Sequence, residues 1–87
     1  MLGARRHRGD RLPDLLAHAS AVFRAWRSHL AALLRQGGVD DAAAQRFAAL
    51  LVASSEGAVV LSRAEQSLEP FELVAEQLIA QAAALPG

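Results

Sequence analysis

The side chains best suited to chemistry in this chain are two serines beside a carboxylate and two histidines. Ser54, Ser55 and Glu56 would suit a nucleophile and its base, but no histidine lies one helical turn away and no glycine-rich turn offers an oxyanion hole. His18 and His29 share a helix face but lie about 16 Å apart along the axis, too far to bind one metal ion. The sequence therefore predicts no catalytic residue, no metal ligand and no cofactor, and it indicates a protein that is not an enzyme.

The composition indicates a small protein with no strongly charged partner. Nine arginines balance nine acidic residues, and the formal net charge is zero, so the overall charge favours neither nucleic acid nor an anionic membrane. The absence of cysteine excludes disulfides and thiolate chemistry and fits a reducing cytoplasm. A domain of 87 residues gains only a thin stability margin from its own core, and oligomerisation is a usual remedy at this size.

Apolar residues spaced by threes and fours predict three helices after a basic tail. Residues 1–12 are expected to form a disordered tail, which includes a basic cluster at residues 5–8 (Arg5, Arg6, His7 and Arg8). Residues 13–87 are expected to form a helical domain. The first helix is expected to begin at Pro13, in its first turn, and to end at the Gly37-Gly38 pair, with Gly37 in the left-handed conformation. No stretch has the alternation of a strand. The predicted fold class is all-α.

The second and third helices have their own start signals. Asp40 is expected to be the N-cap of a second helix of about 25 residues, and Pro70 to open the third helix in its first position. With tight connections the three helices are expected to run antiparallel, in the order up, down and up.

The middle helix is too apolar to lie on a surface alone. From residue 47 to residue 61 its only charge is Glu56, and a helix without a continuous polar face needs cover on nearly every side. That run is shorter than the roughly 18 to 20 residues that span a bilayer, so we expect a soluble protein in the cytoplasm. One face carries the larger side chains expected to pack against the other two helices: Phe47, Leu50, Leu51, Ser54, Ala58 and Leu61.

A second face of the middle helix carries mostly small side chains, which would let another helix approach closely. Gly57 costs about 1 kcal/mol against alanine inside a helix, which suggests a packing reason for its presence. The third helix likewise shows few charges opposite its core side. We therefore expect the last two helices of two copies to form a four-helix dimer interface across a two-fold axis. Its predicted residues are Ala49, Ala53, Glu56, Gly57, Val60, Ala64, Leu73, Gln77 and Ala80.

Two aromatic side chains on the first helix could form the wall of an apolar pocket. Phe23 and Trp26 are spaced to share a helix face, and the predicted ligand-binding set joins them with Leu51, Ser55 and Val59. Plain core packing is the favoured interpretation of the two aromatic residues, because aromatic residues at helical spacing usually lie in a core.

An ordered set of short motifs resembles a known family of regulators. The motifs are Phe23-Arg24-Ala25-Trp26-Arg27, Leu30, Leu33-Leu34, Gly38-Val39-Asp40, Glu56-Gly57-Ala58, Arg63-Ala64-Glu65, Ser67, Pro70 and Val74-Ala75-Glu76-Gln77-Leu78. Over residues 12–85 they resemble the C-terminal domain of TetR-family transcriptional regulators, and within that family the LmrA/YxaF-like group.

The resemblance implies a ligand-sensing and dimerisation domain. In it, residues 41–66 and 70–85 correspond to the two helices that build a four-helix dimer interface, and the first helix corresponds to one that helps enclose an apolar effector. Family members begin with a helix-turn-helix domain, which the residues before Pro13 are too few to form, so we expect no nucleic-acid binding by this chain. A truncated product, a misplaced start or a fragment would explain that difference.

Two other functions stay open at this stage. The chain could be a stand-alone helical module that forms a heterodimer with an intact regulator. It could also be a small protein that binds an apolar ligand at the Phe23 and Trp26 wall.

Overall fold

The fold of this chain is built from three helices and the turns between them. The computed structural model describes the backbone of residues 8–87 and the side chains of residues 11–87. It contains α1 (Arg8–Gln36), α2 (Asp41–Glu65) and α3 (Glu69–Ala83). No strand occurs among these residues, which confirms the all-α fold class.

Helix α1 begins at Arg8, five residues before the predicted start, and carries Pro13 inside it. Pro13 is the sixth residue of α1 and lies in its second turn instead of opening the helix. Only the first four N–H groups of a helix lack a partner, so proline at this position costs α1 one backbone hydrogen bond. The predicted cluster at residues 5–8 falls almost wholly outside the described residues, and the division into a tail and a domain stays a prediction.

The end of α1 is a glycine cap, and the left-handed residue is Gly38 (φ 100°) rather than the predicted Gly37. The N–H of Val39 donates to the carbonyl oxygen of Leu34 at 3.0 Å, and the N–H of Gly38 donates to that of Arg35 at 2.9 Å. These two bonds form a Schellman motif, in which the left-handed residue is the first one after the C-cap. The prediction was therefore wrong by one residue.

Helix α2 has the predicted start and the predicted length of 25 residues. The carboxylate of the N-cap, Asp40, accepts a bond from the N–H of Ala43 at 3.5 Å. At the other end, Gln66 takes the left-handed conformation (φ 53°), and the N–H of Ser67 donates to the carbonyl oxygen of Ser62 at 3.0 Å. A second Schellman motif therefore ends α2, with a residue other than glycine at its left-handed position.

Helix α3 begins at Glu69, with Pro70 in its first turn as the sequence predicts. Its N-cap, Leu68, has no side chain that can accept a hydrogen bond. Two nearby serines supply the acceptors instead. The Oγ of Ser67 accepts from the N–H of Glu69 at 3.1 Å, and the Oγ of Ser62 accepts from the N–H of Phe71 at 3.2 Å. The second bond ties the start of α3 to the end of α2.

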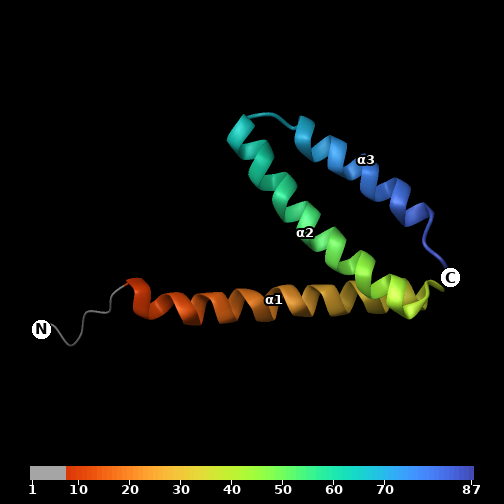
Figure 1. Cartoon of the computed structure of the whole chain (residues 1–87), viewed down its shortest axis with the longest axis horizontal. Helices are drawn as coiled ribbons and strands as arrows, with labels where there is room; N and C mark the ends of the chain where they lie inside the picture. The colour runs from red at the N-terminus through yellow and green to blue at the C-terminus, as the bar shows by residue number, and fades with distance from the viewer. Residues whose placement is uncertain (1–7) are drawn as a thin grey trace, which may run out of the picture.

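The three helices form an open, flat arrangement rather than a closed bundle. Figure 1 shows α2 folding back from the end of α1 at an acute angle, while α3 runs antiparallel beside α2 and the first half of α1 extends away alone. Within the described residues, α2 packs against both other helices but no Cα atom of α1 comes within 8 Å of one in α3. The radius of gyration is 17.5 Å, whereas a compact domain of this length has about 12 Å.

The buried core is small and consists mainly of alanine. Ala31 of α1 is fully buried against Ala44 and Ala48 of α2, with Leu30 and Leu34 packed around them. Small side chains let the two helix axes approach closely at this crossing, which we call the elbow. The elbow core is thus the main intramolecular contact of α1.

The predicted core face of α2 is only partly covered. Phe47 and Ala58 are buried and Leu51 and Ser54 are half-buried, but Leu50 and Leu61 are exposed. The prediction was therefore wrong for Leu50 and Leu61. Because α1 and α3 flank α2 without meeting each other, they leave these two side chains uncovered.

One described helix, α2, has the length and composition to cross a membrane. The run from 47 to 61 is shorter than a span, but the whole helix of 25 residues is long enough. A core helix of a soluble protein has the same properties, so this finding alone is weak evidence for a membrane.

Candidate functional site

The pair formed by α2 and α3 has two broad faces, and each face has its own hollow. On one face, Arg46, Phe47 and Leu50 line a hollow together with Gln81 and Leu85. On the other face, a second hollow of about 240 Å³ lies between the two helices; its lining is Leu51, Ser55, Ala58, Phe71, Val74, Ala75, Leu78 and Ile79. The first of these faces is the one on which a dimer interface was predicted from the sequence, and for that reason alone it is called the dimer face below.

The predicted interface residues of α2 lie on the dimer face. Residues seven apart lie near one another on a helix surface, two turns apart. Arg46, Ala53 and Val60 form one such row, and Leu50, Gly57 and Ala64 form the adjacent row. Because Arg46 and Leu50 line the hollow on this face, the small side chains continue the same surface along α2.

The predicted residues of α3 extend the dimer face across the helix pair. Gln81 lines the hollow on this face, and Gln77 and Leu73 precede it at intervals of four residues, on the same side of the helix. Leu73 and Gln77 are exposed, as is Ala80. The two helices therefore present one continuous uncovered surface.

Gly57 lies open on this surface. A Cβ atom added to Gly57 would meet no atom of this chain within 4 Å. No contact within the described chain therefore requires a glycine there, so a packing reason for it would have to come from another molecule.

Glu56 and Ala49 belong to the border of the dimer face, where it meets α1. Together with Val52 and Ala53 they line a hollow of about 290 Å³ in the angle between α1 and α2, which Phe23 and Arg27 of α1 complete. The hollow is mainly apolar, with one cation and one carboxylate at its edges. We call it the α1–α2 hollow.

The predicted ligand-binding residues are spread over three hollows instead of one. Phe23 lines the α1–α2 hollow, Leu51 and Ser55 line the groove between α2 and α3, and Val59 lines a hollow at the α2–α3 turn. Trp26 packs edge-on against Phe23, with ring centroids 5.9 Å apart. None of these three hollows gathers all five residues, and their ligand role stays a prediction.

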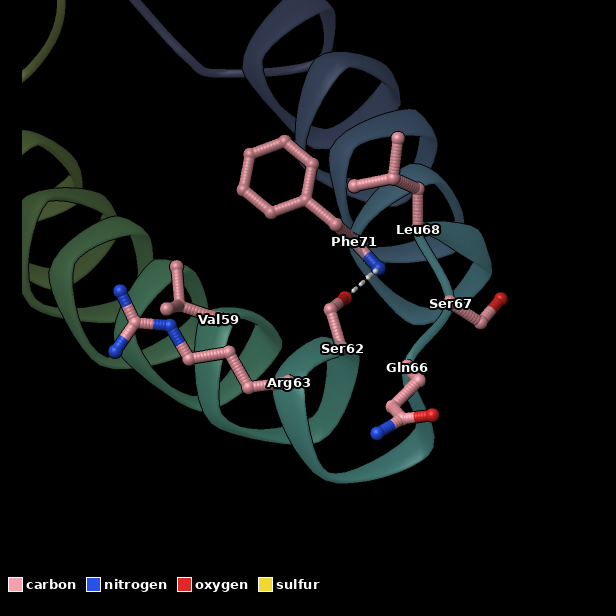
Figure 2. A pocket seen from close by; sticks show the side chains of 7 residues that line it. All are labelled: Val59, Ser62, Arg63, Gln66, Ser67, Leu68 and Phe71. Atoms are coloured by element: carbon pink, nitrogen blue, oxygen red, sulfur yellow. Dashed lines mark hydrogen bonds between the residues drawn. The ribbon is translucent and has the colours of Figure 1, made fainter.

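The hollow at the α2–α3 turn was not predicted from the sequence. It measures about 450 Å³, and its lining is Val59, Ser62, Arg63, Gln66, Ser67, Leu68 and Phe71. Figure 2 shows the side chains of Val59, Phe71 and Leu68 around it, with Arg63 extended along α2 beside Val59. The only signal in the sequence was Leu68, an apolar residue in a short polar turn.

Charged groups are sparse and largely unpaired in the described part of the chain. The ion pair found there joins Arg35 Nη1 and Asp41 Oδ1 at 2.9 Å, across the elbow. No group of three or more His, Asp or Glu residues in this part is placed to hold a metal ion.

Comparisons with known proteins agree on one kind of relative. Residues 8–77 match the family model of the LmrA/YxaF-like transcriptional regulator C-terminal domain. Two relatives in Mycobacterium tuberculosis, one from strain CDC 1551 / Oshkosh and one from strain ATCC 25618 / H37Rv, are described as uncharacterized HTH-type transcriptional regulators. Each is 33% identical to this chain over 69 residues.

Those matches cover 79% of this chain and 36% of each relative. The chain thus spans about a third of the length of the curated relatives it matches. No solved structure matches the chain significantly.

Proposed function

Because the chain belongs to the family of LmrA/YxaF-like transcriptional regulator C-terminal domains, we propose that it is a dimer-forming and effector-binding domain of such a regulator. In this proposal the three helices bind a second copy and a small apolar effector, and they do not themselves bind DNA. The zero net charge supports the last point, because DNA-binding domains usually carry a basic surface. A regulator's role at DNA supports a cytoplasmic location.

The observation that carries the proposal is the uncovered dimer face. Helices of a stable domain bury their apolar sides against a second layer, yet this face has no second layer within the described chain. Val60 and Leu73 expose 65% and 60% of their surface. A second copy related by a two-fold axis would supply the missing layer, with the α2–α3 pairs of both copies forming a four-helix bundle.

The exposed area supports the same conclusion. The chain has 6613 Å² of accessible surface, whereas a compact monomer of 9.2 kDa has about 4900 Å². Burying about 800 Å² or more per copy is typical of a specific interface, and permanent dimers bury more. The uncovered α2–α3 face and the lone first half of α1 both contribute to this excess surface.

Sedimentation equilibrium at micromolar concentration tests the proposal, with Gly57→Leu as the variant. We expect the unchanged chain to be a dimer and Gly57→Leu to dissociate it, because a leucine would hold the two copies apart. The variant should not unfold the monomer, since a Cβ atom added at Gly57 has open space around it and leucine favours a helix more than glycine does.

Ala21→Leu is a matched control, because it adds the same kind of side chain at an exposed position in the first half of α1, which extends away from α2 and α3 (Figure 1). It should leave the dimer intact. A monomer at every concentration, or a Gly57→Leu variant that remains dimeric, would contradict the proposal.

The α1–α2 hollow is the best place for an apolar effector. Its volume of about 290 Å³ is near the lower end of ordinary ligand sites, and it contains Phe23, one of the two predicted ligand residues that come from α1. It also shares Ala49, Ala53 and Glu56 with the border of the dimer face. An effector bound there would touch residues that also shape the dimer.

A further inference from the structure

The hollow at the α2–α3 turn combines an apolar wall with an unpaired cation. Val59, Leu68 and Phe71 expose 36%, 71% and 43% of their surface, and all three line this hollow. Its volume of about 450 Å³ falls within the range of small-molecule sites. The wall could therefore bury an alkyl chain or a ring.

Two side chains of the hollow, Arg63 and Ser62, can donate hydrogen bonds to a ligand. The guanidinium of Arg63 has no carboxylate partner among residues 11–87, where the ion pair joins Arg35 and Asp41. The Oγ of Ser62 accepts a bond from the N–H of Phe71, and its own O–H proton is not used in a hydrogen bond within those residues. No Asp or Glu lines the hollow.

The polar and apolar side chains of the hollow lie at different places around it, as an amphipathic ligand would require. In Figure 2 the Arg63 side chain runs along α2 past Val59, while Ser62 lies next to the backbone nitrogen of Phe71, whose ring points away from Ser62. Gln66 and Ser67 point away from the ring in the same view. A bound anion would thus meet Arg63 at one edge, and its apolar part would lie across Val59 and Phe71 toward Leu68.

We propose that this hollow binds an amphipathic carboxylate, such as a medium-chain fatty acid, with its head group at Arg63. A carboxylate accepts strong, charge-assisted hydrogen bonds from a guanidinium. A cationic or neutral ligand with the same tail would gain only the apolar contact. The hollow shares no residue with the predicted dimer interface, so this proposal does not depend on dimerisation.

Isothermal titration calorimetry with three ligands of equal tail length tests the head-group preference. The ligands are dodecanoate, dodecanol and dodecyltrimethylammonium, each below the concentration at which it forms micelles. We expect dodecanoate to bind at least tenfold more tightly than the other two. Equal affinity for dodecanoate and dodecanol, or no binding of dodecanoate, would overturn the proposal.

Substitutions at Arg63 test the assignment of the head group. Arg63→Gln should remove most of the tenfold preference for dodecanoate, and Arg63→Lys should keep most of it because the charge remains. Arg24→Gln is the control, since it removes an exposed arginine of α1 that lies outside the hollow. An Arg63→Gln variant that retains the preference would overturn the proposal.

Leu68→Ser tests the apolar wall without endangering the fold. Leu68 is the N-cap of α3 and makes no side-chain cap bond, and serine is a preferred N-cap residue. The variant should lower the affinity for dodecanoate and the affinity for dodecanol by the same factor of about three to ten. A loss confined to one ligand, or no loss, would contradict the placement of the tail. The monomeric Gly57→Leu variant should bind dodecanoate as the unchanged chain does.

Discussion

The backbone N–H of Asp40 donates a 3.0 Å hydrogen bond to the carbonyl oxygen of Pro86. This bond brings the segment after α3 back to the elbow between α1 and α2, as Figure 1 shows for the C-terminal end of the chain. Helix α3 is therefore held at both ends, because Ser62 binds the N–H of Phe71 at its start. The carboxylate of Asp40 also caps α2, so one residue connects the elbow to both later helices.

Replacing Asp40 with alanine should destabilise the fold by about 0.5–2 kcal/mol, because α2 loses its N-cap acceptor. Asp40→Asn is the matched control: asparagine caps nearly as well, and the backbone bond to Pro86 is unchanged in both variants. Urea unfolding followed by circular dichroism measures the difference, at one protein concentration because dimerisation would shift the midpoint. Equal midpoints for the alanine variant and the unchanged chain would contradict the cap.

Replacing Gln66 with glycine should stabilise the fold by about 0.5–1 kcal/mol. Gln66 is the left-handed residue that ends α2 (φ 53°), and a side chain with a Cβ atom is disfavoured there whereas glycine is not. Gln66→Ala keeps the Cβ atom and should bring no such gain. Thermal unfolding of the unchanged chain, Gln66→Gly and Gln66→Ala ranks the three proteins by stability. A glycine variant less stable than the alanine variant would refute this explanation.

Local signals in the sequence predict the helices better than they predict how the helices pack. Asp40 marks the start of α2 and Pro70 the first turn of α3, because caps and prolines act within a few residues. The start of α1 was missed because proline usually marks the first turn of a helix, whereas α1 begins at Arg8 and continues through Pro13. Nothing in the helical periodicity showed that α1 and α3 would not meet, since periodicity gives the apolar side of a helix but not its neighbour.

The same limit explains the candidate sites. The exposure of Gly57 and Val60 follows from the helix pattern, whereas the gathering of Phe23 and Glu56 in one hollow depends on the angle between α1 and α2. The turn hollow depends on how Leu68 and Phe71 lie against α2 after the chain reverses. Such angles are set by the alanine contacts at the elbow and by the cap bonds of Ser62, which no short motif encodes.

Replacing Ala48 with leucine should destabilise the elbow by about 1–3 kcal/mol, because overpacked cores must shift their backbones or strain their side chains. Ala48 is fully buried against Ala31 of α1. Ala42→Leu is the control, since Ala42 is exposed in the first turn of α2. In urea unfolding, the midpoint of Ala48→Leu should be clearly lower than that of Ala42→Leu. Similar midpoints would show that α1 does not pack closely on α2 at this point.

The fluorescence of Trp26 should report on ligands in the α1–α2 hollow. Trp26 is the only tryptophan, and its ring packs edge-on against Phe23, which lines that hollow. Half of Trp26 is exposed (51%), so an apolar compound that binds beside Phe23 should shift its emission to shorter wavelength as water is displaced. Val52→Asp, which places a charge in the lining, should abolish the shift, because burying an unpaired carboxylate is costly. Arg63→Gln should leave the shift unchanged, since Arg63 lines the separate turn hollow. An emission that does not respond to any apolar compound, or a shift that survives in Val52→Asp, would rule out this hollow as the effector site.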